Sequence, residues 1–192
     1  MEWSDREAAA EACKGNQYAF RILVERHSHA LFRLAFRMTG NEQDAEDLVQ
    51  DTFIRAYRQL DRFDARASFS TWLYRICANR ALDLLRTRKV RKEYQPAQND
   101  EGGPGWLETV AAHDPSPERL AHSRQLADLL PAALENLTEL ERAAFVLRHY
   151  EGFDIHQVSE ALGVKASAAK QSIFRAVQKL RRALRPVWEA RA

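Results

Sequence analysis

The sequence has few residues of the kinds that support a disulfide-bonded, metal-binding or membrane-embedded protein. Only two of its 192 residues are cysteine, Cys13 and Cys77, so it holds neither a disulfide framework nor a zinc-ligand pair. Both lie in helical patterns, and we expect them to be small buried side chains. No apolar run approaches the roughly 20 residues of a membrane span, and the charged N-terminus lacks a signal-peptide core. We therefore expect a cytoplasmic protein without membrane insertion, metal site or cofactor.

Glycine and proline are also scarce, with 7 and 6 residues, and no long stretch alternates apolar and polar positions. Apolar residues instead recur with helical spacing on both sides of a segment that is rich in proline and glycine. That segment, residues 95–125, predicts a flexible linker. We expect an all-α protein with two small helical domains, residues 1–94 and residues 126–192, joined by this linker.

The net charge of +2 does not by itself indicate a nucleic-acid partner, but the charges are unevenly distributed. Residues 41–51 are acidic, whereas residues 86–92 and 175–191 are mostly basic where they are charged. This asymmetry suggests one face for a basic protein partner and others for phosphate. For Asp44 and Glu46 we favour a simpler interpretation, that of a solvated helix N-terminus stabilised by the helix dipole. The basic run 86–92 has the alternative of a merely solvated face.

The segment FSTWLYRICAN, residues 69–79, combines aromatic rings, an amide and a guanidinium on one predicted helix. Aromatic rings can stack on unpaired bases, an amide can read a base edge, and guanidiniums can hold phosphates. The helical period points Trp72 and Leu73 toward the core and leaves Tyr74 and Arg75 facing away. The segment is therefore typical of a reader of single-stranded nucleic acid.

The C-terminal segment has the pattern of a helix-turn-helix. A capping box at Thr138 and Glu141 starts one helix, and Gly163 provides the tight turn before a last helix that begins near residue 166. The positions expected to be exposed on this last helix suit contacts with a DNA groove and with phosphates: Lys170, Gln171, Phe174, Arg175, Gln178 and Lys179. A three-helix bundle without DNA binding is the alternative for this segment taken by itself.

Two motifs in the chain resemble a known family. DAEDLVQDTFIRAY at residues 44–57, together with residues 63–64, 68–79 and 81–86, resembles the second conserved region of the extracytoplasmic-function (ECF) sigma factors of bacterial RNA polymerase. LRHYEG at 147–152 and VSEALG at 158–163, within residues 137–184, resemble the fourth region. The resemblance covers about residues 15–185 and implies two helical domains without a third between them.

The resemblance also implies function. The protein would be a non-catalytic specificity subunit that binds core RNA polymerase through the β′ clamp coiled coil and the β flap. It would recognise the −35 promoter element as duplex and the −10 element as an opened strand, and an anti-sigma factor would hold it inactive. The implied polymerase contacts are Asp47, Leu48, Gln50, Asp51 and Phe53.

The resemblance assigns promoter contacts to both domains. The implied −10 residues are Phe63, Asp64, Ser68, Tyr74, Arg75, Asn79, Arg80, Arg86, Arg88 and Lys89, with Asn79 on the opened strand and the last four on phosphates. The implied −35 residues are Lys165, Ser167, Lys170, Gln171, Phe174, Arg175 and Lys179. The chain departs from the family at residues 167–169, which read Ser-Ala-Ala, and at Ser172, which occupies a position that is commonly basic. An arginine lost at Ser172 would remove a contact worth about 1–3 kcal/mol.

Two other functions fit parts of the sequence. A stand-alone helix-turn-helix regulator would bind duplex DNA tightly, but it leaves the acidic and aromatic helices unexplained. A metal-dependent nuclease would use the carboxylates Asp44, Glu46, Asp47 and Asp51, yet four carboxylates on one short helix do not converge on a metal.

Overall fold

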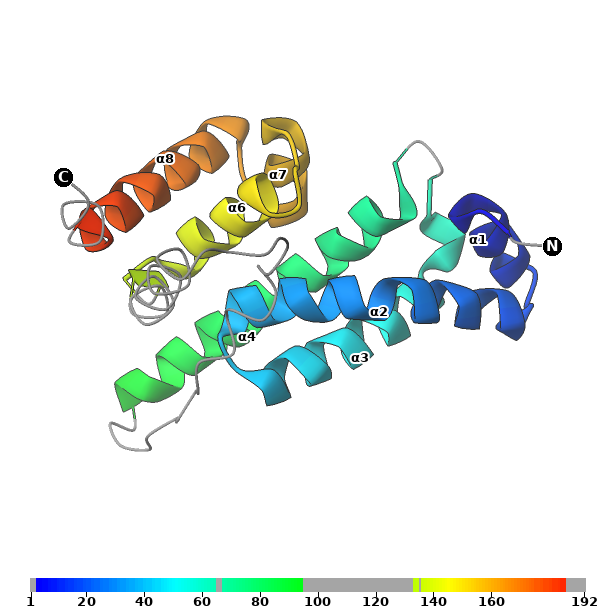
Figure 1. Ribbon diagram of the computed structural model, residues 1–192. Helices are drawn as coiled ribbons and strands as arrows, with labels where there is room; N and C mark the ends of the chain where they lie inside the picture. The colour runs from blue at the N-terminus through cyan, green and yellow to red at the C-terminus, as the bar shows by residue number, and fades with distance from the viewer. Residues whose placement is uncertain (1–2, 65–66, 95–132, 135, 186–192) are drawn as a thin grey trace, which may run out of the picture. The chain divides into compact units, whose positions relative to one another are not determined.

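The computed structural model describes residues 3–64, 67–94, 133–134 and 136–185, and all regular structure among them is helical (Figure 1). The helices are α1 (Asp5–Cys13), α2 (Gln17–Thr39), α3 (Glu42–Arg58), the 3₁₀ helix η1 (Leu60–Arg62), α4 (Phe69–Tyr94), α6 (Glu139–His149), α7 (Ile155–Leu162) and α8 (Ala166–Ala183). The all-α expectation is confirmed. None of the helices in the described ranges is long and apolar enough to cross a membrane.

The chain divides into two compact units, Met1–Leu85 and Arg86–Ala192. The boundary falls inside α4, nine residues before the domain end predicted at residue 94. The predicted linker, residues 95–125, lies outside the described residues.

The first unit is built around α2, which buries one apolar stripe. Leu23, Leu31, Leu34 and Met38 are all buried along this helix. Asn16 caps its start, and Gly40 ends it with a φ of 69°, a left-handed conformation that glycine adopts without a Cβ clash.

A side-chain cap fixes the start of the helix α3. The side chain of Asn41 accepts a hydrogen bond from the backbone N–H of Asp44 at 2.9 Å, so Asn41 is the N-cap and the first helical residue is Glu42. The expectation of a solvated Asp44 is wrong, because its side chain is buried against the unit's interior, whereas Glu46 is exposed as expected.

The short helix α1 is tied to α2 by charged groups. Asp5 accepts a hydrogen bond from Arg26 and shares another, at 2.7 Å, with the largely buried ring of His27. The packing side of α1 is made of alanines, including Ala8 and Ala9. Cys13 ends this helix on the exposed side, so the expectation of a buried thiol is wrong there, while Cys77 is buried as predicted.

The helix α4 buries a wider strip than the sequence indicated. Leu73 and Cys77 are fully buried, and the neighbouring Tyr74 is also buried, with 9% exposure. Trp72 is half-buried, with its ring 5.4 Å from that of Phe63. Tyr74 was predicted to face away from the core, and its burial contradicts that prediction.

The second unit contains the predicted helix-turn-helix. Thr138 and Glu141 form the expected capping box, with the Glu141 carboxylate accepting from the Thr138 N–H at 2.9 Å. Gly163 ends α7 at a φ of 62°, the left-handed conformation that the turn requires. Val158, Leu162 and Ala169 form the small core at the turn.

An ion pair with a buried carboxylate joins α6 to α8, and the Lys179 side chain remains 42% exposed. The Glu141 carboxylate also accepts a hydrogen bond from Lys179 Nζ at 2.7 Å, and its side chain is only 7% exposed. Burial on its own raises the pKa of Glu141, but the hydrogen bonds from Lys179 and from the Thr138 backbone outweigh it and leave the pKa lowered.

This lowered pKa predicts an acid-sensitive second unit. A carboxyl group with a pKa lower in the folded than in the unfolded chain stabilises the fold above the unfolded pKa of roughly 4.3, and that stability is lost as the pH falls further. We expect Glu141→Gln to cost about 1–3 kcal/mol at neutral pH and progressively less in acid. Calorimetric unfolding of the full chain between about pH 3 and pH 7 measures this loss of unfolding free energy as a function of pH. Glu139→Gln in the same helical turn is the matched control, and an equal cost at every pH contradicts the prediction.

Candidate nucleic-acid and protein interfaces

A groove between α2 and α3 is the candidate protein interface. Its walls come from Val24, Ser28, His29 and Phe32 on α2 and from Gln43, Glu46, Asp47, Val49, Gln50, Phe53 and Ile54 on α3. Two exposed carboxylates, those of Glu46 and Asp47, lie beside apolar side chains. A partner helix that carries both basic and apolar side chains would complement this lining.

The predicted polymerase contacts divide into three groups in the structure. Asp47, Gln50 and Phe53 line the groove, although Phe53 is almost entirely buried beneath it. Leu48 does not line the groove and is only 4% exposed, so it packs in the core and its assignment as a direct contact is wrong. Asp51 lies outside the groove lining and pairs with arginines. Ile54 was not among the predicted contacts, but it lines the groove and is 44% exposed.

Asp51 on α3 forms an ion pair with Arg80 on α4. Its Oδ2 atom accepts hydrogen bonds from Arg55 Nε at 2.9 Å and from Arg80 Nε at 2.7 Å. Arg80 also donates to Asp83 at 3.3 Å. Burial alone raises the pKa of Asp51, but the hydrogen bonds from Arg80 and Arg55 together lower it, so the carboxylate is ionised at neutral pH.

The start of α4 carries the first group of predicted −10 residues. Ser68 caps the helix by accepting a hydrogen bond from the Thr71 N–H at 3.1 Å. The Phe63 ring packs 5.5 Å from the Phe69 ring and is half-buried, whereas Asp64 is exposed. Residues 65–66, between Asp64 and Ser68, lie outside the described residues.

Further along α4, Asn79 presents an exposed amide. Its Nδ2 donates to the Arg75 carbonyl one turn earlier, at 2.9 Å. Arg75 is half-buried, Arg86 is exposed and Arg88 is half-buried. Lys89 lies within α4, and its side chain is outside the described part of the molecule.

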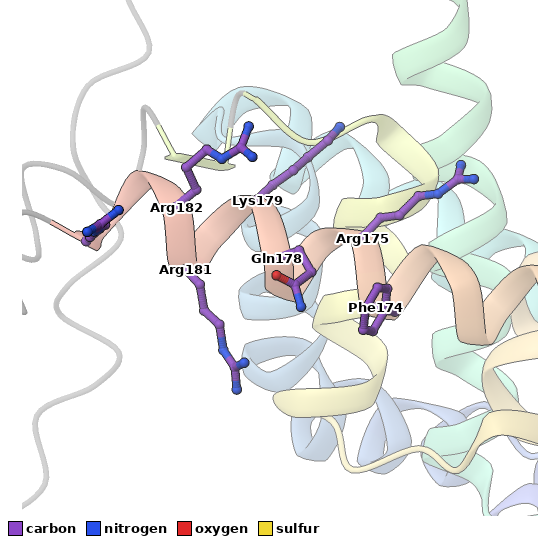
Figure 2. Close-up of a pocket in the computed structure, with 7 residues that line it drawn as sticks. Phe174, Arg175, Gln178, Lys179, Arg181 and Arg182 are labelled. Atoms are coloured by element: carbon purple, nitrogen blue, oxygen red, sulfur yellow. The ribbon is translucent and has the colours of Figure 1, made fainter.

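The outer face of α8 is the candidate duplex-DNA interface (Figure 2). All the predicted −35 residues are exposed there: the N-cap Lys165, Ser167, Lys170, Gln171, Phe174, Arg175 and Lys179. The Phe174 side chain is 64% exposed. A shallow groove on the C-terminal half of this helix is lined by Phe174, Arg175, Gln178, Lys179, Arg181, Arg182 and Arg185. The last three arginines were not predicted as contacts, although their spacing of three and four residues continues the face begun by Phe174 and Arg175.

Two predicted features of α8 need correction. Ser172 is buried, at 8% exposure, so its position faces the core of the unit and the supposed loss of a DNA contact there is wrong. Lys179 is held by the Glu141 carboxylate and also donates to the Asn136 carbonyl, so its ammonium group is not free for phosphate as predicted.

A nuclease site receives no support from the described residues. Among them, no group of three or more histidine, cysteine or carboxylate side chains could hold a metal ion. Asp44 is buried and Asp51 is engaged by Arg55 and Arg80, so these two side chains do not join Glu46 and Asp47 in a common site.

The fold and its surfaces define a class of helical DNA-binding protein that has a second, acidic interface for a protein partner. A family model of Sigma-70 region 2 matches residues 23–91, and one of Sigma-70, region 4 matches residues 127–180. The chain is 39% identical over 160 residues to the ECF RNA polymerase sigma factor SigE of Mycolicibacterium smegmatis, covering 83% of this chain and 59% of SigE. It is 32% identical over 185 residues to the ECF RNA polymerase sigma factor SigW of Bacillus subtilis, covering 96% and 99%.

Solved structures agree with the sequence comparisons. The structure of CnrH in complex with the cytosolic domain of CnrY matches with a TM-score of 0.62 and 31% identity, covering 95% of this chain and 97% of CnrH. The sigma factor RpoE in complex with the anti-sigma factor NepR from Bartonella quintana shares the fold, with a TM-score of 0.61 and 24% identity over 86% of this chain and 96% of RpoE. The chain therefore belongs to the ECF sigma factors of the sigma-70 family.

Proposed function

We propose that this sigma factor binds core RNA polymerase and directs it to promoters through two separate DNA contacts, one to an opened −10 strand and one to a duplex −35 element. The observation that supports this most directly is that one chain carries both a helix-turn-helix with an exposed basic face and a second helix with an exposed amide. The domain division at residues 1–94, 95–125 and 126–192 is part of the same proposal.

The chemistry of the two helices suits the two states of DNA. The outer face of α8 offers Arg175 and Gln171 for base edges and phosphates of the major groove, and Phe174 for a thymine methyl group. The Asn79 amide can read the Watson–Crick edge of a base only after the strands separate, because pairing occupies that edge in the duplex. Arg86, Arg88 and Lys89 would contact phosphates near the melting point.

The groove between α2 and α3 would receive the β′ clamp coiled coil of the polymerase. Asp47 and Glu46 supply negative charge, and Val24, Phe32 and Phe53 supply apolar surface. Such a lining suits a helix that presents arginine or lysine beside an apolar side chain. The second unit would contact the β flap.

Regulation would use the same groove. The proteins CnrH and RpoE were each solved with a bound partner, the cytosolic domain of CnrY and the anti-sigma factor NepR. By similarity, an anti-sigma factor would inactivate this chain in the cytoplasm by covering its polymerase-binding groove. The isolated chain itself would carry out no catalysis, because the polymerase holds the reacting groups.

A charge reversal in the groove tests polymerase binding. We expect Asp47→Lys to weaken binding to bacterial core RNA polymerase at least tenfold, because it places like charge against a basic partner. The measurement is a titration of labelled sigma factor with purified core enzyme. Glu25→Lys, on an exposed face of α2 outside the groove, is the matched control. The proposal fails if the unaltered chain does not bind core enzyme in the absence of any inhibitor.

A further inference from the structure

One carboxylate links the helix that carries the groove to the helix that carries Asn79. Asp51 Oδ2 accepts from Arg80 Nε on α4 at 2.7 Å and from Arg55 Nε on α3 at 2.9 Å. All three side chains are between 35% and 40% exposed, so the cluster lies at the surface of the first unit and not in its core. Arg80 is further held by Asp83, one turn along α4.

The two members of this pair are next to the residues that carry the proposed function. Asp51 follows Gln50 directly and lies one turn after Asp47, and both of these residues line the groove. Arg80 follows Asn79 directly. The Asp51–Arg80 pair therefore spans the short distance between the docking surface of α3 and the base-reading position of α4.

We propose that Asp51 and Arg80 are positioning residues that set the rotation of α4 about its axis and so aim Asn79 at the opened strand. This inference rests on the proposed function. It replaces the assignments that the family resemblance implied, in which Asp51 contacts the polymerase and Arg80 contacts phosphate.

Helix geometry explains why a pair at Arg80 would control Asn79. Consecutive residues point about 100° apart around a helix, so fixing the direction of Arg80 fixes that of Asn79. Within the described residues, the Asn79 side chain bonds only to the Arg75 carbonyl on the same helix. That bond orients the amide relative to α4, but it does not orient α4 relative to α3. The buried side of α4, which includes Ala78 and Ala81, supplies one constraint on that orientation, and the Asp51–Arg80 pair supplies another directly beside Asn79.

A positioning role and a phosphate-binding role for Arg80 predict opposite effects of Asp51→Asn on the interaction with DNA. If Arg80 were a phosphate ligand restrained by Asp51, then Asp51→Asn would release it and strengthen DNA binding. If the pair positions Asn79, Asp51→Asn and Arg80→Gln both weaken open-complex formation. The two effects are then not additive, because either change breaks the same pair.

The experiment measures open-complex formation by permanganate reactivity with saturating core polymerase, so that differences in core affinity do not contribute. We expect Asp51→Asn and Arg80→Gln each to reduce the rate about fivefold, the size typical of a partly exposed ion pair. The double variant is also expected to lose about fivefold, not the roughly 25-fold of independent effects. Arg58→Gln removes an exposed arginine on α3 that is outside this cluster, and it is the matched control.

A second comparison separates positioning from a general loss of folded protein. In an Asn79→Ala background, Arg80→Gln is expected not to reduce the rate of open-complex formation further, because the side chain that Arg80 positions is already absent. A persistent fivefold loss in that background, additive effects in the double variant, or stronger DNA binding by Asp51→Asn would each overturn the inference. Failure of the unaltered chain to bind core enzyme would instead overturn the proposed function.

Discussion

Asn79→Ala is expected to reduce open-complex formation about tenfold while leaving the affinity for core polymerase nearly unchanged. The substitution removes an exposed amide from α4 without disturbing the core, because the side chain bonds only to the Arg75 carbonyl in the described structure. Losing one hydrogen bond between an amide and a base edge costs about 0.5–1.5 kcal/mol, and the upper end of that range corresponds to the tenfold change.

The measurement for Asn79→Ala combines permanganate footprinting of the promoter with a core-polymerase pull-down. Gln17→Ala, which removes an exposed amide in the first turn of α2, is the control because no predicted interface includes it. Equal losses in the footprint and in the pull-down would contradict the assignment of Asn79 to the opened strand.

Arg175→Ala is expected to have the largest effect on promoter selection, with a loss of about 10- to 100-fold in −35-dependent transcription. Arg175 is exposed on the outer face of α8, next to Phe174 in the basic groove (Figure 2). An arginine that binds a guanine edge contributes about 1–3 kcal/mol of discrimination, and that contribution is absent in alanine.

The Arg175→Ala variant also tests whether −35 recognition and −10 recognition belong to separate units. Binding to a pre-melted −10 fragment by the same holoenzyme should stay within about twofold of the unaltered protein, because independent sites affect each other little. Arg6→Ala, at an exposed arginine on α1, controls for the loss of one positive charge. If −35-dependent transcription and −10 binding fell together, the recognition helix would have been assigned wrongly.

Local features of the fold could be predicted because each depends on residues within one or two helical turns. The capping box at Thr138 and the tight turn at Gly163 were both predicted and are both present. The exposed face of α8 was predicted for the same reason, since the helical period places Lys170, Phe174 and Arg175 on one side.

Several residues were misplaced because a single helical stripe underestimates how much of a packed helix is covered. Seven residues of the first half of α4 are buried: Phe69, Leu73, Tyr74, Cys77, Ala78, Ala81 and Leu82. Successive members are four, one, three, one, three and one residues apart, which describes two adjacent stripes, and Tyr74 belongs to the second. Ser172 and Asp44 were misplaced because a polar residue at a buried position cannot be recognised from apolar periodicity.

The sequence by itself determined the helical class, the caps and turns, the exposed recognition face and the family, because these follow from short-range spacing and from motifs. Only the tertiary structure decided which charged side chains are free to meet a partner. Arg80 is 29 residues from Asp51, and Lys179 is 38 residues from Glu141, yet each forms a 2.7 Å ion pair across two helices. Such pairs depend on how the helices pack against one another. The sequence alone does not distinguish a lysine or arginine that is paired with a distant carboxylate from one that is not.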